Sequence, residues 1–271
     1  MTSGSTHKAV ILARGLGTRM RSQDSGAKLD AAQATVAETG LKAMIPIGRP
    51  FLDYVLSALA DAGYSEVCLV IGPEHARVRE YYEKEANVTR LRIVLAEQAR
   101  PLGTADAVLA AERFAGNDPF VVLNSDNYYP TTALAALRRS APPALVGFDR
   151  DTLIERGNVP ADRVGRFGAL EIDNDGNLVR IATADPKMRR TESVYASMNC
   201  WLFTPTIFRA CREVPLSPRG ELELPRAVQL AVDKYGEKFR VIRMSEAVLD
   251  LSSRGDIASV AARLTATNVS L

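Results

Sequence analysis

Histidine and cysteine are scarce in this sequence. His7 and His75 are the only histidines among 271 residues, so a histidine-rich zinc site and a Ser-His-Asp triad are both poorly supported. The three cysteines, Cys68, Cys200 and Cys211, lie far apart in the chain, and two of them sit within apolar runs. We interpret them as buried free thiols, which indicates a reducing compartment.

Long hydrophobic runs are also missing. No apolar run reaches the roughly 18–20 residues that a membrane-spanning helix needs, and the initial residues MTSGSTHK lack the apolar core of a signal peptide. The net charge of +2 gives no reason to expect a nucleic-acid or membrane surface. We therefore expect a cytoplasmic protein that binds neither nucleic acid nor a membrane. The oligomeric state stays open, a homo-oligomer included.

The order of the apolar segments predicts an α/β fold. Short runs that are mostly or wholly apolar predict strands at 10–12, 67–71, 92–96, 120–123, 144–148, 198–203, 240–244 and 248–251. Segments with helical spacing lie between them, at 50–59, 74–84, 106–114, 131–139, 223–235 and 256–264. This alternation favours a mixed, mostly parallel sheet flanked by helices. No linker divides the chain, so we expect a single domain over residues 1–271.

Three regions depart from this alternation. Residues 1–7 are small and polar, and we expect them to be frayed. Residues 22–40 are polar and rich in alanine, so we expect an insertion loop with at most one helical turn, acting either as a solvated insertion or as a lid. The sequence alternates over 165–181 around Asn174-Asp175-Gly176, which predicts a β-hairpin within a region at 151–200.

A glycine-rich loop follows the first predicted strand. Gly15 and Gly17 precede Thr18 and Arg19; the backbone N–H groups of such a loop can surround an anion, and a guanidinium adds bidentate donors. The pattern favours a phosphate-binding loop. A dinucleotide-binding loop would need a glycine where Met20 stands, and the Gly-Lys-Ser/Thr of a Walker loop is absent. On this stretch alone, a plain strand and turn stays an alternative.

Asp126 is the first carboxylate after the predicted strand at 120–123, and Asp250 comes directly after the apolar residues Val248 and Leu249. Ligands of an open parallel sheet bind beyond the carboxyl ends of its strands. Mg²⁺ is usually held by one or two carboxylates together with substrate phosphates. The pair therefore predicts a magnesium site for phosphate transfer, although a helix cap or turn is an equal alternative for Asp126 alone.

The loop GLGTRM at 15–20 resembles the signature of the sugar-1-phosphate nucleotidylyltransferases, and further matches follow in order. Residues 42–46 (KAMIP) resemble the family's Lys-Pro-Met-Ile-Pro segment, Gln98 with 103–105 (GTA) its base-reading segment, and Asp126 with 250–253 (DLSS) its metal-binding segments. The resemblance spans about 8–264. It implies a Rossmann-like fold of the GT-A type whose hairpin region binds the sugar. The implied reaction is Mg²⁺-dependent transfer of a nucleoside monophosphate from a nucleoside triphosphate to a sugar 1-phosphate.

The resemblance also implies roles for individual residues. Arg19 would bind the leaving pyrophosphate, Lys42 would orient the α- or acceptor phosphate, and Asp126 and Asp250 would hold Mg²⁺. Lys28 is a rival to Lys42, because its distance from Arg19 is nearer the usual spacing. The nucleotide would contact Leu12, Ala13, Gly15, Gly17, Thr18, Arg19, Gln98, Gly103 and Thr104, and Gln98 leans toward uracil or thymine, hence UTP or dTTP. The sugar side would involve Asn127, Gly168, Lys187, Asn199 and Trp201, with core packing an equal alternative for Trp201.

Some positions depart from the family pattern. Residues 183–186 (TADP) stand where Glu-Lys-Pro is usual, Arg14 replaces a glycine, and Ser252 replaces another. Two alternatives therefore stay open: a non-catalytic nucleotide-sugar-binding regulatory protein on the same fold, and a nucleotidylyltransferase with a non-hexose phosphate acceptor. A glycosyltransferase that uses Asp126 is a third alternative, but it would leave the Arg19 loop without a role.

Overall fold

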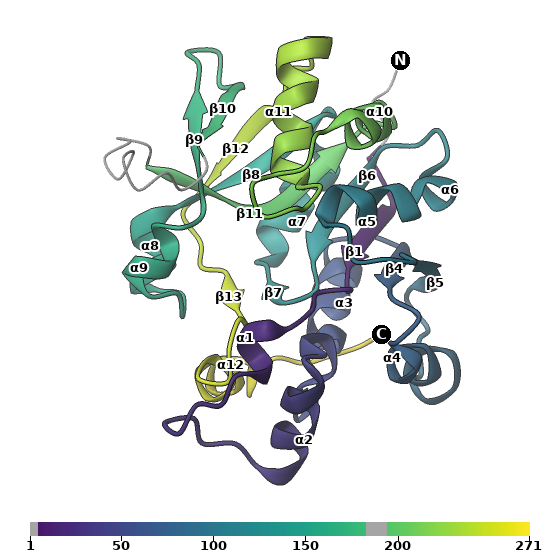
Figure 1. Ribbon diagram of the computed structural model, residues 1–271, viewed down its shortest axis with the longest axis vertical. Coiled ribbons are helices and arrows are strands. Elements are labelled where there is room, and N and C mark those ends of the chain that lie inside the picture. The colour runs from purple at the N-terminus through teal and green to yellow at the C-terminus, as the bar shows by residue number, and fades with distance from the viewer. Residues whose placement is uncertain (1–4, 183–193) are drawn as a thin grey trace.

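The computed structural model describes residues 5–182 and 194–271. Within these residues a nine-stranded mixed sheet forms the centre of the molecule (Figure 1). Four neighbouring strands are parallel, in the order β6 (Phe120–Asn124), β1 (Lys8–Leu12), β4 (Glu66–Ile71) and β5 (Arg92–Glu97). Along β1, Ala9 and Ile11 belong to one buried cluster, whereas Val10 and Leu12 belong to another. A strand buried on both faces needs apolar residues throughout, which explains the unbroken hydrophobic run.

The other side of the sheet is built around the antiparallel strand β11 (Tyr195–Phe203). On one side, β11 pairs with β8 (Ala144–Asp149) at 195–197 and again at 201–202. On its other side, 196–197 pair with β9 (Gly168–Ile172) and 201–203 pair with β6. The register shifts between Ser197 and Trp201, where Asn199 has a positive φ of 55°. β12 (Arg240–Met244) extends the sheet parallel to β8, and β10 (Leu178–Ala182) pairs with β9. The irregularity in β11 thus lies where the strand changes neighbours.

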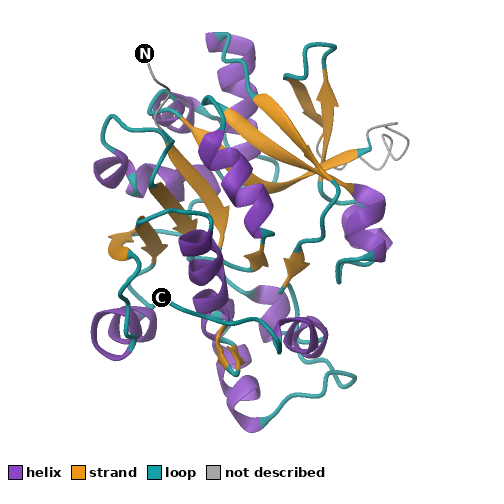
Figure 2. Ribbon diagram, turned by 180° about the vertical axis from the view of Figure 1, so that it is seen from behind, coloured by secondary structure: helices purple, strands orange, loops and turns teal. Residues whose placement is uncertain are grey.

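Helices cover both faces of the sheet. Figure 1 shows α5 (Thr104–Ala110), α10 (Ile207–Glu213) and α11 (Leu224–Tyr235) in front of it, and Figure 2 shows the opposite face from behind. That face carries α3 (Phe51–Asp61) and α7 (Thr131–Arg139). The smaller helices are α4 (Ala76–Glu80), which continues into a π-helical turn at Tyr81–Glu85, α6 (Glu112–Ala115), α8 (Arg150–Glu155), α9 (Ala161–Val164) and α12 (Asp256–Leu264). The short strands are β2 (Pro46–Ile47), β3 (Arg49–Pro50), β7 (Asn127–Tyr128) and β13 (Leu249–Asp250).

The predicted α/β class is confirmed. The parallel strands, the flanking helices and the strand at 240–244 lie where the sequence pattern places them. The hairpin of β9 and β10 closes at 174–176, with Gly176 at a φ of 83°.

The expectation for residues 22–40 is wrong in part. After the short helix α1 (Thr18–Arg21), the segment forms the nine-residue helix α2 (Ala31–Thr39). The Asp30 carboxylate accepts a bond from the Gln33 N–H at 2.8 Å, and the Gln33 side chain accepts one from the Asp30 N–H at 3.2 Å. This capping box and the alanine content favour a helix even though the segment has no apolar stripe.

The prediction of a frayed start does not hold for Thr6. Residues 1–4 lie outside the described part of the chain, but Thr6 is buried and its hydroxyl donates to the Pro119 carbonyl. All three cysteines are buried and free, as predicted. In the part of the chain that the structure describes, no helix is long and apolar enough to cross a membrane.

Candidate active site

A cavity of about 300 Å³ lies beyond the carboxyl ends of β1 and β6. This is the edge at which open α/β sheets bind ligands. The cavity is lined by Gly15, Leu16, Gly17, Thr18, Arg19, Lys42, Asn124, Asp126, Asn127, Phe167, Ser197, Met198, Asn199, Asp250 and Ser252. The fold therefore brings the predicted phosphate loop, both predicted metal-binding aspartates and Lys42 together around one space.

The glycine loop packs closely against the end of α2. Gly17 has a φ of 61° and precedes α1, and a Cβ atom built on it would lie 2.1 Å from the Gly40 carbonyl oxygen. No side chain fits there, so the loop packs at Gly17 directly against the backbone of Gly40, which ends α2. Among the described residues, no protein acceptor pairs with the N–H groups of Gly15, Leu16 or Gly17. The loop thus offers backbone donors to an anion in the cavity.

Asp250 is fixed by a small antiparallel bridge. β13 pairs with β7 so that Asp250 faces Asn127, and the Leu251 N–H donates to the Asp126 carbonyl at 2.8 Å. From the other side, Asn158 accepts a bond from the Asp250 N–H at 2.7 Å and donates its amide to the Asp250 carbonyl at 2.9 Å. The two predicted aspartates therefore belong to one rigid junction.

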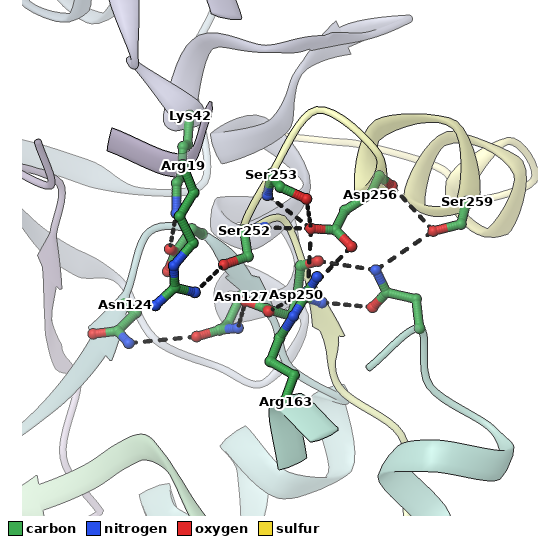
Figure 3. Close-up of polar contacts among 12 residues, drawn as sticks. Arg19, Lys42, Asn124, Asn127, Arg163, Asp250, Ser252, Ser253, Asp256 and Ser259 are labelled. Atoms are coloured by element: carbon green, nitrogen blue, oxygen red, sulfur yellow. Dashed lines mark hydrogen bonds and ion pairs between the residues drawn. The ribbon is translucent and has the colours of Figure 1, made fainter. Parts of the chain in front are cut away.

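The Asp250 carboxylate is surrounded by donors. Asn127 donates to Oδ1 at 3.0 Å and Arg163 donates to Oδ2 at 2.9 Å (Figure 3). Burial and the negative charge of Asp126 nevertheless raise the pKa of Asp250 to about 6, although Arg163 and Lys42 act in the opposite direction. The two carboxylates are thus close enough to repel each other, an arrangement that favours a bound cation.

The second carboxylate, Asp126, accepts an ion pair from Lys42, whose Nζ atom lies 2.9 Å from Oδ2. Its Oδ1 atom has no protein partner among the described residues. Two carboxylates next to the predicted phosphate-binding loop are a donor set that suits Mg²⁺, which keeps several waters and takes its other ligands from substrate. Asp126 and Asp250 thus fit a magnesium ion. Lys28, the rival to Lys42, is exposed and does not line the cavity.

The predicted base-reading residues lie beside the cavity and not on its wall. Gln98 is only 3% exposed, and its amide nitrogen donates to the Gly103 carbonyl at 3.0 Å and to Asp106 at 2.7 Å. Gly103 has a φ of 122°, and a Cβ atom there would lie 2.5 Å from the Leu222 carbonyl oxygen. Packing against residue 222 thus requires this glycine, whether or not a base approaches it.

Three other predicted nucleotide contacts have roles in the fold. The Thr104 hydroxyl accepts a bond from the Leu224 N–H at 2.8 Å, at the start of α11. Leu12 and Ala13 are buried. Arg14, which stands in place of a glycine, donates to the main-chain carbonyl of Gln98 and makes a bidentate ion pair with Glu74 at 3.0 and 3.1 Å. Its guanidinium therefore lies next to Gln98.

The sugar-side predictions have mixed outcomes. Asn127 and Asn199 line the cavity, and Gly168 follows the lining residue Phe167. Lys187 and the segment 183–186 lie outside the described residues. Trp201 is fully buried and stacks on Phe203 with 5.9 Å between ring centroids. The structure thus places Trp201 in the core, as the packing alternative expects, and its indole N–H donates to Oδ1 of the cavity-lining residue Asn199 at 3.4 Å.

Sequence analysis missed three residues of the site. They are Asn158, Arg163 and Asp256. Arg163 NH1 bridges Asp250 to Asp256, 3.1 Å from both Asp256 oxygens. Asp256, three residues after Ser253, has the spacing of a turn or helix cap, which is a usable local signal. Arg163 and Asn158 come from the loop-rich region before β9 and carry no such signal.

Comparisons with known proteins show which family the chain resembles. A sequence profile described as nucleotidyl transferase matches residues 8–265. A glucose-1-phosphate thymidylyltransferase from Streptomyces antibioticus is 32% identical over 237 residues, which cover 83% of this chain and 57% of the relative. The UTP–glucose-1-phosphate uridylyltransferase AglF from Haloferax volcanii is 26% identical, with 90% of each chain covered.

A solved structure of UDP-glucose pyrophosphorylase complexed with UDP-glucose has the same fold. The TM-score is 0.74 at 17% identity, and the match covers 96% of this chain and 99% of that one. The chain spans only 57% of the length of the thymidylyltransferase that it matches. The profile covers nearly the whole sequence, and the loop, the lysine and both aspartates of the resemblance meet in one cavity. The chain belongs to the nucleotidyl transferase family.

Proposed function

We propose that this chain transfers a nucleoside monophosphate from a nucleoside triphosphate to a sugar 1-phosphate, with release of pyrophosphate. The observation that carries the proposal is the convergence on one cavity of Arg19, Lys42, Asp126, Asp250 and the open N–H groups of the glycine loop. The names of the matched thymidylyl- and uridylyltransferases agree with this reaction.

The chemistry needs no nucleophile from the protein. A phosphate oxygen of the sugar 1-phosphate attacks the α-phosphorus, the bond from that phosphorus to the bridging oxygen breaks, and pyrophosphate leaves with the electron pair. Catalysis of such a step comes from positioning and charge stabilisation. In this proposal Arg19 and the glycine loop bind the leaving pyrophosphate, and Lys42 binds the α-phosphate. Asp126 and Asp250 would hold Mg²⁺, which when bound neutralises phosphate charge.

We further propose UTP or dTTP as the nucleotide. Both N–H donors of the Gln98 side-chain amide are used by Gly103 and Asp106, so the side-chain oxygen Oε1 is the group left to accept a hydrogen bond from a base. The N3–H of uracil or thymine is a matching donor. The names of the relatives support the same two bases. A cytoplasmic location stays part of the proposal, supported by the three free thiols.

The test is pyrophosphate release with Mg²⁺ across each nucleoside triphosphate paired with a panel of sugar 1-phosphates. We expect release with one preferred pair. Asp126→Asn should abolish turnover with the fold retained, while Asp151→Asn, at an exposed helical position, should stay active. Near-normal turnover of Asp126→Asn would contradict the site. No release from any pair, in a protein that still binds nucleotide, would favour the regulatory alternative.

A further inference from the structure

We propose that Ser252 is a positioning residue that orients Arg19 for the pyrophosphate group. The inference rests on the proposed function, because it concerns the arginine that is proposed to bind the leaving group. Arg19 is exposed, and its NH1 atom donates to Ser252 Oγ at 2.8 Å (Figure 3). Within the described residues this is the one protein partner of its guanidinium. A free arginine in water samples many rotamers, so a fixed acceptor reduces the entropy lost on binding a phosphate.

The acceptor itself is rigid. Ser252 is only 4% exposed, and its N–H donates to Asp256 Oδ2 at 3.1 Å. The same oxygen accepts bonds from the N–H of Ser253 at 2.7 Å and from its hydroxyl at 2.9 Å. The Asp256 carboxylate therefore binds the backbone N–H groups of the turn at 252–253, and the Ser252 hydroxyl is left to accept from Arg19.

A second hydrogen bond joins the same two segments in the opposite direction. Arg254 is buried, and its Nε donates to the Met20 carbonyl, one residue after Arg19, at 2.9 Å. α1 and the turn after β13 are thus joined by two hydrogen bonds, one donated by Arg19 of α1 and one donated by Arg254 of the turn. Because this turn begins at Asp250, one segment positions both the metal-binding carboxylate and the phosphate-binding cation.

The structure gives Ser252 a role that the sequence motif did not indicate. In the sequence it stands in place of a glycine and looks like a weakened motif. A glycine would offer no hydroxyl to Arg19, so here the substitution adds a contact to the site. The neighbouring Ser253 provides a matched comparison, because its hydroxyl binds Asp256 and not Arg19.

The experiment measures binding of Mg²⁺-pyrophosphate by calorimetry, together with KM and kcat in both reaction directions. Ser252→Ala should weaken pyrophosphate binding about tenfold, or about 1.4 kcal/mol, as expected for loss of a bond to a charged donor. Its KM for the sugar 1-phosphate should stay within about twofold, since that site is not changed. Ser253→Ala should bind pyrophosphate like the wild type, and Ser252→Thr, which keeps the hydroxyl, should retain most of the affinity.

Several outcomes would overturn the inference. Equal weakening in Ser252→Ala and Ser253→Ala would place the effect in the turn and not in the hydroxyl. Tighter pyrophosphate binding by Ser252→Ala would mean that the serine holds Arg19 away from the ligand. If Ser252→Ala fails to fold, Ser252→Gly removes the hydroxyl with the same expectation. Wild-type protein that binds pyrophosphate but transfers no nucleotide would refute the proposed function, and the binding comparison would still decide the role of Ser252.

Discussion

Replacement of Asp250 by asparagine should abolish catalysis and yet stabilise the metal-free protein. The folded protein raises the pKa of this carboxyl from 3.8 to about 6, chiefly through burial and secondly through Asp126. A raised pKa means that the charged form is disfavoured in the folded state, so stability is greatest below about pH 4 and is lost as the pH rises through about 6. At about pH 8 the loss is about 3 kcal/mol, from the 1.36 kcal/mol that each pKa unit represents.

Asparagine has the same shape but carries no charge, so it avoids this loss. It cannot accept from both Asn127 and Arg163 as the carboxylate does, which costs about 1 kcal/mol. The net gain at about pH 8 is therefore about 2 kcal/mol, or an increase in Tm of about 4–8 °C for a chain of this size. Because most of the carboxyl is protonated at about pH 5 in the folded protein, the advantage over the wild type should grow by about 1 kcal/mol between about pH 5 and about pH 8.

The assay is thermal unfolding of wild type and Asp250→Asn in a metal chelator across this pH range, with activity measured in parallel. Added Mg²⁺ should raise the Tm of the wild type more than that of the variant, since a ligand stabilises the state that binds it. An asparagine variant that is less stable than the wild type at every pH would refute the argument. It would show that Arg163 and Asn127 compensate the charge fully and that the site has no residual need for a cation.

Two other substitutions test the loop and the lysine. Gly17→Ala should destabilise the protein by about 2 kcal/mol or more, because it combines a positive φ with a Cβ 2.1 Å from the Gly40 carbonyl oxygen. Gly236→Ala, which has the same left-handed backbone at a φ of 66° but open space around its Cβ, should cost only about 1 kcal/mol in the same urea titration, and equal costs would refute the packing argument. Lys42→Met should lower kcat about 100-fold or more, as for other groups that stabilise transition-state charge, whereas Lys28→Met should change it by less than about twofold; the reverse order would mean that Lys28 moves into the site.

Local signals in the sequence predicted most of the fold. The apolar runs of the parallel strands and the turn at 174–176 each depend on a few neighbouring residues, so they survive without knowledge of the tertiary structure. α2 was missed because its exposed, alanine-rich surface gives no apolar stripe, and the useful signal was the capping box of Asp30 and Gln33. Helices that contribute little to the core are thus better recognised by their ends than by their period.

The residues of the site also differ in whether a local sequence signal indicates them. The position of Asp126 was predictable because it follows β6, at the edge where the parallel strands end. Asp250 is the last residue of β13, and it reaches the same cavity because β13 pairs with β7, directly after Asp126. Arg163 was not predictable, since it reaches Asp250 from a four-residue helix 87 positions away in the sequence. Gly103 shows the opposite limit: a residue that matched a ligand-binding motif also has a purely structural requirement, its contact with Leu222.

The charges around the cavity explain why nucleotide and metal should enter together. Lys42 and Arg163 already compensate the two carboxylates that would hold a divalent cation. A cation that arrives alone must compete with both of these partners, at a cost in Coulomb energy. If the proposed function is correct, a cation that arrives with a triphosphate would let Lys42 exchange its pairing with Asp126 for one with a phosphate, so that no charge would be left without a partner. Under the proposed function, these two ion pairs would therefore favour the metal–nucleotide complex over either component alone.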